Sequence, residues 1–305
     1  MKAQRLPGNP IITADTPGLD AETSGNINGP SLIQAPPWLD KPLARYYLYF
    51  AHHNGNHIRL ALADDLAGPW RVHAGGTLQL SQTSFSHHIA SPDVHLDHDH
   101  QRVVMYYHGC CNKDPVIRWP QYTCVATSPD GLAFTSATEP LCQSYLRIFT
   151  WRGGHYGLAM PGELYRSDDG LTAFRPRAGK LDALTRARRD EDRTRMARHF
   201  ALALRDDTLD VYFSRIGDCP ERILHASIHL DDDWLRWRPT EPTTLLEPEH
   251  AWEGADQPLT PSRPAKSVKP VRQLRDPAVY EEAGRTYLLY SVAGEMGIAI
   301  AELTP

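Results

Sequence analysis

The chain repeats one pattern five times, and this repeat constrains its fold more than any other feature. Each unit has a strand-like run rich in Tyr, Leu and Val, a polar turn, a second alternating run, and then a Ser/Asp/Gly segment followed by an aromatic residue. Alternation with a period of two predicts β-strands, and hairpin-like polar turns predict antiparallel pairing. The units are RYYLYFAHHNGNHIRLALADDLAGPW, RVVMYYHGCC with YTCVATSPDGLAF, HYGLAMPGELYRSDDGLTAF, TLDVYFSRIGDCPERILHASIHLDDDWLRW and RTYLLYSVAGEMGIAIAEL.

A further short strand precedes each unit and begins with polar or charged residues. These strands start at Asn28, Ser91, Ser144, Ala197 and Leu274. Four antiparallel strands repeated at intervals of roughly 40 to 50 residues are typical of β-propeller blades. We therefore predict an all-β fold, a five-bladed β-propeller that forms one domain over residues 1–305.

The last unit stops at Leu303 after its third strand, so its fourth strand must come from another part of the chain. We expect the N-terminal GNPIIT, around Ile11 and Ile12, to supply it, because this closes the ring and removes an exposed sheet edge. The Pro-rich stretch 258–270 is expected to be a long loop between the fourth and fifth blades. One stretch, LDALTRARRDEDRTRMARH, looks helical, and its charges of both signs favour a solvated surface excursion over an RNA-binding helix.

The composition limits the classes of molecule that the chain is expected to bind. The formal charge is -5, with 32 basic and 37 acidic residues mixed along the chain, so we expect no nucleic-acid partner. The start has no signal-peptide pattern and no run approaches the roughly 20 apolar residues that cross a bilayer, so we expect no membrane association. Five cysteines without a CxxC pair are read as reduced packing residues of a cytoplasmic protein. The oligomeric state is not predicted.

Propeller topology brings dispersed polar residues to one face. The loops that lead into the inner strands and the loops that join the second and third strands of each blade open on the same side, around the central funnel. The first set supplies Asn28, His87, His88, Asp93, Arg147, Arg198, His199, Arg275 and Asp276. The second set supplies His52, His53, His108, Glu163, Asp218, Glu221 and Glu295. We expect these side chains to converge there as a catalytic and substrate-binding set.

Several carboxylates in one funnel fit carbohydrate chemistry. Cleavage of a glycosidic bond needs one carboxylic acid and one carboxylate that serves as base or nucleophile, with their pKa values held apart by their surroundings. Asp93 lies near His87 and His88, and Asp276 follows Arg275, so both have neighbours that favour the ionised form. We predict Asp93, Asp276 and Glu221 as the catalytic residues, with Glu221 as the acid.

Other candidates complete the expected site. Trp119 and Trp151 lie near the same face and are candidates to stack on a sugar ring. We expect no cofactor and no metal ligands, because the chain contains no HExxH motif. A metal ion such as calcium, held where imidazoles from several blades meet, is the alternative.

Two motifs carry a family resemblance. LRDPAVYEEAGRTYLLYS, from Leu274 to Ser291, resembles the RDP blade motif of the five-bladed propeller glycoside hydrolases of families 43, 32 and 117, and NGPSLI resembles their first-blade DP motif. The resemblance implies that Asp276 tunes the acid or binds substrate. Family 43 enzymes commonly place the general base where this chain has Asn28, which cannot accept a proton. The DCPE stretch at Asp218 is similar to the ECP motif of family 32, but it falls in a turn.

The favoured interpretation is a glycoside hydrolase that acts on a short oligosaccharide. Arg147, Arg198 and Arg275 suggest an acidic or otherwise unusual sugar, because guanidinium groups pair with planar anions. The alternatives are a polysaccharide lyase or hydrolase that uses His88 or His199, and a carbohydrate-binding propeller without activity.

Overall fold

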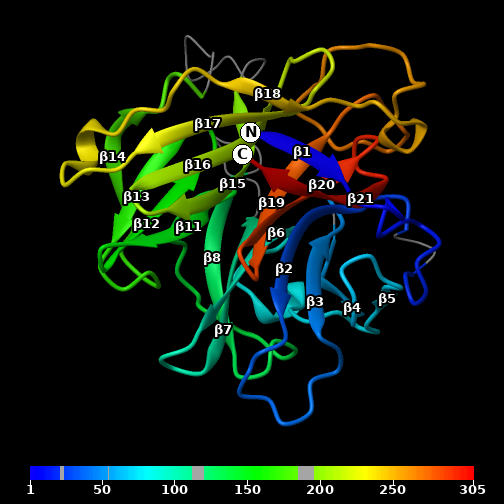
Figure 1. Cartoon of the computed structure of the whole chain (residues 1–305). Coiled ribbons are helices and arrows are strands. Elements are labelled where there is room, and N and C mark those ends of the chain that lie inside the picture. The colour runs from blue at the N-terminus through cyan, green and yellow to red at the C-terminus, as the bar shows by residue number, and fades with distance from the viewer. Residues whose placement is uncertain (21–23, 54, 112–119, 185–195) are drawn as a thin grey trace.

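Five antiparallel β-sheets, one for each predicted unit, surround a common centre in the computed structural model (Figure 1). The structure describes residues 1–20, 24–53, 55–111, 120–184 and 196–305. The predicted five-bladed β-propeller is confirmed. Each blade has its first strand innermost and pairs the following strands outward in chain order, as the hairpin pattern of the sequence predicts.

The bounds of the strands follow the predicted blades. Blade 1 is formed by β2 (Asn28–Gln34), β3 (Tyr46–Ala51), β4 (Arg59–Ala63) and β5 (Arg71–Val72). Blade 2 is formed by β6 (His88–Asp97), β7 (Arg102–Cys110), β8 (Gln121–Ser128), β9 (Thr135–Ser136) and β10 (Cys142–Gln143). Blade 3 is formed by β11 (Arg147–Trp151), β12 (Gly154–Ala159), β13 (Glu163–Ser167) and β14 (Arg175–Lys180). Blade 4 is formed by β15 (Ala197–Arg205), β16 (Thr208–Arg215), β17 (Ile223–His229) and β18 (Thr243–Leu246). Blade 5 is formed by β19 (Arg275–Glu282), β20 (Arg285–Val292), β21 (Gly297–Thr304) and β1 (Lys2–Arg5).

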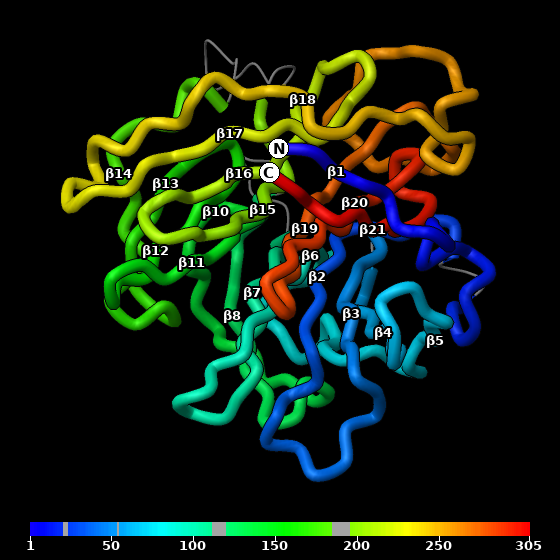
Figure 2. The backbone as a smooth tube through the Cα atoms, in the orientation of Figure 1, coloured from blue at the N-terminus to red at the C-terminus, as the bar shows by residue number. Residues whose placement is uncertain are grey.

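The N-terminus closes the last blade, but with a different segment from the expected one. β1 pairs antiparallel with β21, so the two termini lie side by side (Figure 2). The expected donor segment contributes a single bridge between Ile12 and Ile298 at the other end of β21. Pro10 explains the difference, because a proline has no N–H to give to a ladder, whereas every residue of β1 has one.

The apolar core lies between the blades. Every residue of β3 is buried, and its alternating side chains face two neighbours. Tyr46, Leu48 and Phe50 join an apolar cluster with strands of blade 5, whereas Tyr47 and Tyr49 join a cluster with strands of blade 2. A strand that is covered on both faces needs the continuous apolar run that YYLYFA supplies. Packing of this kind fixes the blades around the funnel.

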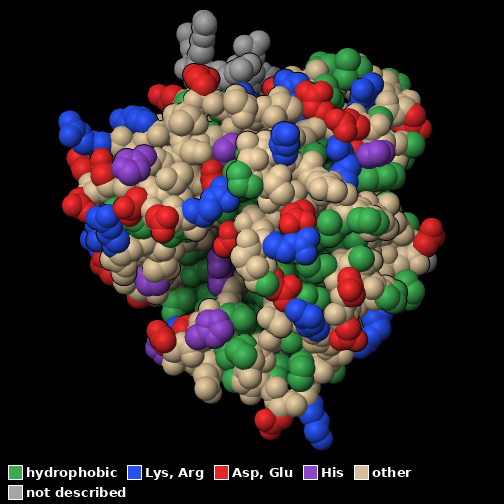
Figure 3. Space-filling view, viewed as in Figure 1, with side chains coloured by type: hydrophobic (Ala, Val, Ile, Leu, Met, Phe, Trp, Pro, Cys, Tyr) green, Lys and Arg blue, Asp and Glu red, His purple; other side chains and the backbone are tan. Residues whose placement is uncertain are grey.

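The remaining expectations concern loops and surface. Residues 247–274 connect blades 4 and 5 without a strand, as predicted for the Pro-rich stretch. Most of the expected helix, residues 185–195, lies outside the described residues, and Ala197 already begins β15. In the described part of the chain no helix is long and apolar enough to cross a membrane. Acidic and basic side chains are interspersed over the face shown in Figure 3.

Candidate active site

A left-handed residue stands at the start of the inner strand in every blade. A positive φ in a residue other than glycine is uncommon and costs about 1–3 kcal/mol, so its recurrence at this position in four blades, with a glycine there in the fifth, indicates that the position has a specific structural role. A register shift follows it in blades 1, 2, 4 and 5, as in a β-bulge, which re-aims side chains. The five residues and their φ angles are Gly29 (61°), Ser91 (49°), Tyr145 (63°), His199 (55°) and Asp276 (47°).

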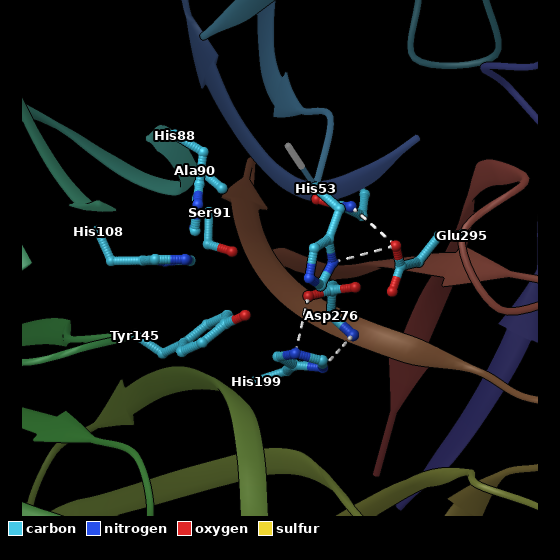
Figure 4. A pocket seen from close by; sticks show the side chains of 10 residues that line it. His53, His88, Ala90, Ser91, His108, Tyr145, His199, Asp276 and Glu295 are labelled. Atoms are coloured by element: carbon cyan, nitrogen blue, oxygen red, sulfur yellow. Dashed lines mark hydrogen bonds and ion pairs between the residues drawn. The ribbon is translucent and has the colours of Figure 1, made fainter. Parts of the chain in front are cut away.

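The bulges aim four of these side chains into one central pocket. Figure 4 shows Ser91, Tyr145, His199 and Asp276 pointing toward a shared space. Blade 1 supplies Gly29 instead, where an added Cβ would lie 3.0 Å from the Cα of Ser91, so the two inner strands approach too closely for a side chain. The full lining consists of Asn28, His53, His88, Ala90, Ser91, His108, Tyr145, His199, Asp276 and Glu295.

The pocket is small and polar. The space between its lining atoms, part of which is open to solvent, is about 260 Å³. The side chains that line it are polar apart from that of Ala90.

Two carboxyl groups in the pocket have opposite pKa shifts. Burial, followed by the charge of Glu295, raises the pKa of Asp276 to about 7. Burial alone would also raise the pKa of Glu295, but the hydrogen bond and charge of His53 and the charge of Arg275 lower it to about 2. Glu295 is therefore ionised at neutral pH, whereas Asp276 still holds a proton in about half of the molecules.

Glu295 is held by donors on both oxygens. Arg275 donates to Oε1 at 2.7 Å, while Asn26 at 2.5 Å and Asn28 at 3.2 Å donate to Oε2. His53 Nδ1 lies 3.3 Å from the same oxygen. Four partners leave this carboxylate little freedom to attack a substrate, but they fix a negative charge in the pocket wall.

His199 orients Asp276. The backbone N–H of Asp276 donates to His199 Nδ1 at 3.4 Å, so this ring nitrogen is the acceptor. The proton of the neutral ring is then on Nε2, which lies 3.4 Å from Asp276 Oδ1. Burial, together with the nearby Arg198 and Arg275, lowers the pKa of His199 well below its ordinary value, so the ring is neutral. His199 therefore presents a neutral N–H donor to the carboxyl group of Asp276, and not a positive charge.

Aromatic rings line the rest of the wall. Neighbouring rings contact one another in the order His53, His88, His108, Tyr145 and His199, with centroid separations of 6.5, 5.7, 4.2 and 4.9 Å. Burial, followed by the charges of His53 and His87, lowers the pKa of His88 to about 4. The pKa of His108 also falls, first through burial, and its Nδ1 has no hydrogen-bond partner among the described residues. Neutral imidazoles of this kind accept protons.

The predicted acid, Glu221, lies beneath the pocket. Its carboxylate is fully buried and accepts two hydrogen bonds from Arg198, at 2.9 and 2.6 Å, and one from Ser214 at 2.7 Å. Arg275 Nε stands 3.3 Å away. Burial would raise the pKa of Glu221, but the charges of Arg198 and Arg275 lower it, which is opposite to what an acid needs. The structure gives Glu221 the position of a structural ion-pair partner.

The three arginines are likewise structural. Arg198 and Arg275 pair with Glu221, and Arg275 also pairs with Glu295. Arg147 donates to the backbone oxygens of Ser91 and Leu146, at 3.2 Å each. All three are buried and engaged within the protein. The expectation that these three arginines bind an acidic substrate is therefore corrected, because their guanidinium groups are engaged by partners within the protein.

Asp93 is also displaced from its expected place. Its carboxylate accepts from the backbone N–H of Ile148 at 3.0 Å and lies 3.0 Å from His95 Nε2, and it is not part of the pocket lining. The register shift between Ala90 and Asp93 explains this, because the bulge turns Ser91 inward in its place.

Four further expected residues lie away from the pocket lining. His87 is exposed. Glu163 accepts a hydrogen bond from Tyr165 at 2.6 Å, and Asp218 lies 3.9 Å from Arg222. Trp151 is buried against Trp237, whereas Trp119 lies outside the described residues. The structure does bring together seven of the predicted residues: Asn28, His53, His88, His108, His199, Asp276 and Glu295.

The sequence reading missed Ser91 and Tyr145. One signal was available for Ser91: G-P, S-P and D-P recur at the starts of the inner strands of blades 1, 2 and 5. This alignment places Ser91, not Asp93, at the position of Asp276. Tyr145 precedes a leucine and carries no such mark. Among the described residues, no group of three or more His, Cys, Asp or Glu side chains is arranged to hold a metal ion.

Comparison with known proteins finds one relative by sequence and several solved structures with a similar fold. No family model matches the chain. The uncharacterized protein R118 of Acanthamoeba polyphaga mimivirus is 36% identical over 321 residues, covering 98% of this chain and 89% of that protein.

Solved structures share the architecture at low identity. The GH43 beta-xylosidase/alpha-arabinofuranosidase CoXyl43 from a compost metagenome, in complex with xylotriose, superposes with a TM-score of 0.60 at 13% identity, covering 92% of each chain. The GH43_1 enzyme of Xanthomonas citri with xylose gives 0.60 at 12%, covering 92% of this chain and 88% of that one. The alpha-L-arabinofuranosidase of Lactobacillus brevis gives 0.58 at 13%, covering 97% and 92%. At these identities the likeness shows the fold, that of the family 43 propellers.

Proposed function

Since the chain belongs to the same protein family as the uncharacterized protein R118 of Acanthamoeba polyphaga mimivirus and has the fold of the family 43 glycoside hydrolases, we propose that it is a glycosidase that cleaves a small carbohydrate in its central pocket. The observation that carries this proposal is the pair of pocket carboxyl groups with opposite pKa shifts. Two carboxyl groups whose surroundings separate their pKa values are the requirement of glycosidic hydrolysis. Structures with a similar fold hold xylose and xylotriose.

Asp276 is the proton donor in this proposal. A group with a pKa of about 7 is still protonated in a useful fraction of molecules at neutral pH, and it gives up its proton readily. As the glycosidic bond breaks, the proton of Asp276 goes to the leaving oxygen. The fixed negative charge of Glu295 stabilises the positive charge that develops on the sugar ring.

The base is a histidine in this proposal. In blade 1 the position equivalent to Asp276 is Gly29, which has no side chain, and both oxygens of Glu295 are occupied by donors. His88 lines the pocket as a neutral imidazole with a pKa of about 4, which is the basicity of an ordinary carboxylate. His88 takes a proton from water as the water oxygen attacks the anomeric carbon, and the reaction is a single displacement.

Asp276→Asn tests the proposal, with Asp93→Asn as the matched control. Both changes convert an aspartate of an inner strand to an amide, Asp276 buried and Asp93 partly buried, but only Asp276 lines the pocket. Wild-type protein is incubated with xylotriose and with aryl xylosides and arabinofuranosides, and released sugar is quantified. We expect Asp276→Asn to lower kcat by about 10²- to 10⁴-fold and Asp93→Asn to keep it within a few-fold. A wild-type rate in Asp276→Asn, or no sugar released from any glycoside, refutes the proposal.

Analysis of the reaction products also distinguishes the proposed hydrolase from a second candidate function, a polysaccharide lyase. His108 Nδ1 has no hydrogen-bond partner among the residues that the structure describes and lies beside Tyr145, an arrangement that suits proton abstraction by a histidine-based lyase. A lyase gives an unsaturated product that absorbs in the ultraviolet, a hydrolase gives new reducing ends, and a binding protein gives neither.

A further inference from the structure

Tyr145 lines the central pocket, but the proposed hydrolysis does not use its hydroxyl group. Figure 4 shows its side chain directed into the space that it shares with Asp276. Among the residues that the structure describes, this hydroxyl has no hydrogen-bond partner. A tyrosine packed into a protein usually has a partner for its hydroxyl, so this one is available to a ligand in the pocket.

The backbone of Tyr145 has a conformation that a bulky residue rarely adopts. Its φ angle is 63°, in the left-handed region. Both neighbouring residues are fixed by hydrogen bonds. The backbone oxygen of Ser144 accepts from the N–H of Met160 at 3.1 Å, and the N–H of Leu146 donates to Thr123 Oγ1 at 3.4 Å. Backbone strain persists where the surroundings over-determine it and is concentrated at functional sites, so the strained residue is a candidate for a role in the reaction.

The ring of Tyr145 is held between two imidazoles. Its centroid lies 4.2 Å from that of His108 and 4.9 Å from that of His199. Burial, the largest cause, lowers the pKa of both histidines well below the ordinary value, so both rings are neutral. Burial, followed by the charge of Asp276, raises the pKa of the Tyr145 hydroxyl, which therefore keeps its proton. Tyr145 thus offers an O–H donor at a fixed position in the pocket wall.

The hydroxyl of Tyr145 lies on the side of the pocket where the bond is broken. His199 contacts the ring of Tyr145 and also lies 3.4 Å from Asp276 Oδ1, so it holds both groups. In the proposed reaction Asp276 protonates the glycosidic oxygen, which is bonded to the anomeric carbon. The polar groups of the sugar next to that carbon are the ring oxygen and the 2-hydroxyl. The ring oxygen becomes positive in the transition state and does not accept a hydrogen bond, whereas bonds to the 2-hydroxyl strengthen there.

We propose that Tyr145 is a further catalytic residue, whose hydroxyl donates a hydrogen bond to the 2-hydroxyl of the sugar that is cleaved. The inference rests on the proposed function and deepens it by naming the substrate class, glycosides with an unsubstituted 2-hydroxyl. No covalent bond to Tyr145 forms or breaks. The hydrogen bond contributes to the rate because it is stronger in the transition state than in the bound substrate.

Tyr145→Phe tests the inference, with Tyr156→Phe as the matched control. Each change removes one hydroxyl that has no hydrogen-bond partner in the described part of the chain, but Tyr156, in β12, does not line the pocket. The substrates are the aryl xyloside or arabinofuranoside that the wild type cleaves and its 2-deoxy counterpart. We expect Tyr145→Phe to lower kcat for the first by about 10- to 100-fold and for the second by no more than about twofold. Tyr156→Phe keeps both rates, and both variants unfold at the temperature of the wild type.

Three results overturn the inference: an unchanged kcat for the 2-hydroxyl substrate in Tyr145→Phe, an equal loss for the 2-deoxy substrate, or a lower unfolding temperature of Tyr145→Phe alone, which reveals an internal partner.

Calorimetric titration with xylose and 2-deoxyxylose separates this inference from the proposed function, because it involves no turnover. We expect Tyr145→Phe to weaken the binding of xylose by about two- to tenfold and to leave that of 2-deoxyxylose unchanged. Such binding without hydrolysis of any glycoside removes the glycosidase proposal alone. Hydrolysis that needs Asp276 but not Tyr145 removes the assignment of Tyr145 alone, and the absence of both binding and hydrolysis removes both.

Discussion

Replacement of Asp276 by asparagine is expected to stabilise the protein at alkaline pH while it abolishes activity. Burial, and then the charge of Glu295, raise the pKa of this carboxyl group from an ordinary 3.8 to about 7. The folded protein therefore binds the proton more tightly than the unfolded chain does. Between about pH 4 and pH 7 the folded state holds more protons, so the free energy of unfolding falls as the pH rises through that window.

The size of the effect follows from the same pKa. At 1.36 kcal/mol for each pKa unit, the ionised carboxyl group destabilises the folded protein by about 4 kcal/mol above pH 7 and by almost nothing below about pH 4. An asparagine has no proton to lose, so it removes this loss. We expect Asp276→Asn to exceed the wild type in unfolding free energy by a few kcal/mol at about pH 8 and to resemble it at about pH 4.

Urea denaturation followed by tryptophan fluorescence measures the difference at several pH values. Asp93→Asn is the matched control. Burial would raise the pKa of Asp93, but the charge and hydrogen bond of His95 lower it, so loss of this carboxylate destabilises the protein at neutral pH. A gap between Asp276→Asn and the wild type that stays constant from about pH 4 to pH 8 refutes the assignment of a raised pKa to Asp276.

Two further substitutions test the architecture of the site. Glu221→Gln leaves buried Arg198 with an incomplete partner and is expected to lower the unfolding free energy by about 3–5 kcal/mol, whereas Glu302→Gln, in an exposed ion pair with Arg285, is expected to lower it far less. Equal stability of the two variants in urea contradicts a structural role for Glu221. Gly29→Ala is expected to be destabilised more than Gly284→Ala, because both have a positive φ but only a Cβ at residue 29 meets a neighbour, at 3.0 Å. Thermal unfolding of the pair isolates the crowding, and equal losses contradict the close approach of the inner strands.

The fold was predictable because the sequence of every blade has the same local pattern of alternating strands and polar turns. In β3, YYLYFA alternates between two inter-blade cores, and the polar turns that follow such runs fix antiparallel pairing. The closing strand was misplaced for a local reason. Ile11 and Ile12 look more strand-like than the polar residues of β1, but Pro10 cannot donate to a ladder, and backbone pairing with β21 decides the outcome.

The site was harder to predict because a bulge breaks the alternation on which the reading depends. Because the backbone of Ser91 is left-handed, its side chain points into the pocket, whereas the side chain of Asp93 faces His95. The sequence shows the charge of Arg198, but it does not show that Glu221 neutralises this charge within the core. Partners brought together by blade packing decide whether such a group binds substrate or supports the wall.

The repeated bulge also explains how this pocket departs from that of a two-aspartate enzyme. Each blade presents one left-handed position to the axis, and only blade 5 fills it with a carboxylate, Asp276. The second carboxylate, Glu295, comes from the loop between β20 and β21, and both of its oxygens accept hydrogen bonds from donors within the protein. In the proposed reaction, proton transfer at the other side of the pocket falls to neutral imidazoles, and His88, whose pKa burial lowers to about 4, is the assigned base. Substitution at these positions changes the chemistry without disturbing the sheets, because the bulges hold each side chain outside the strand pairing.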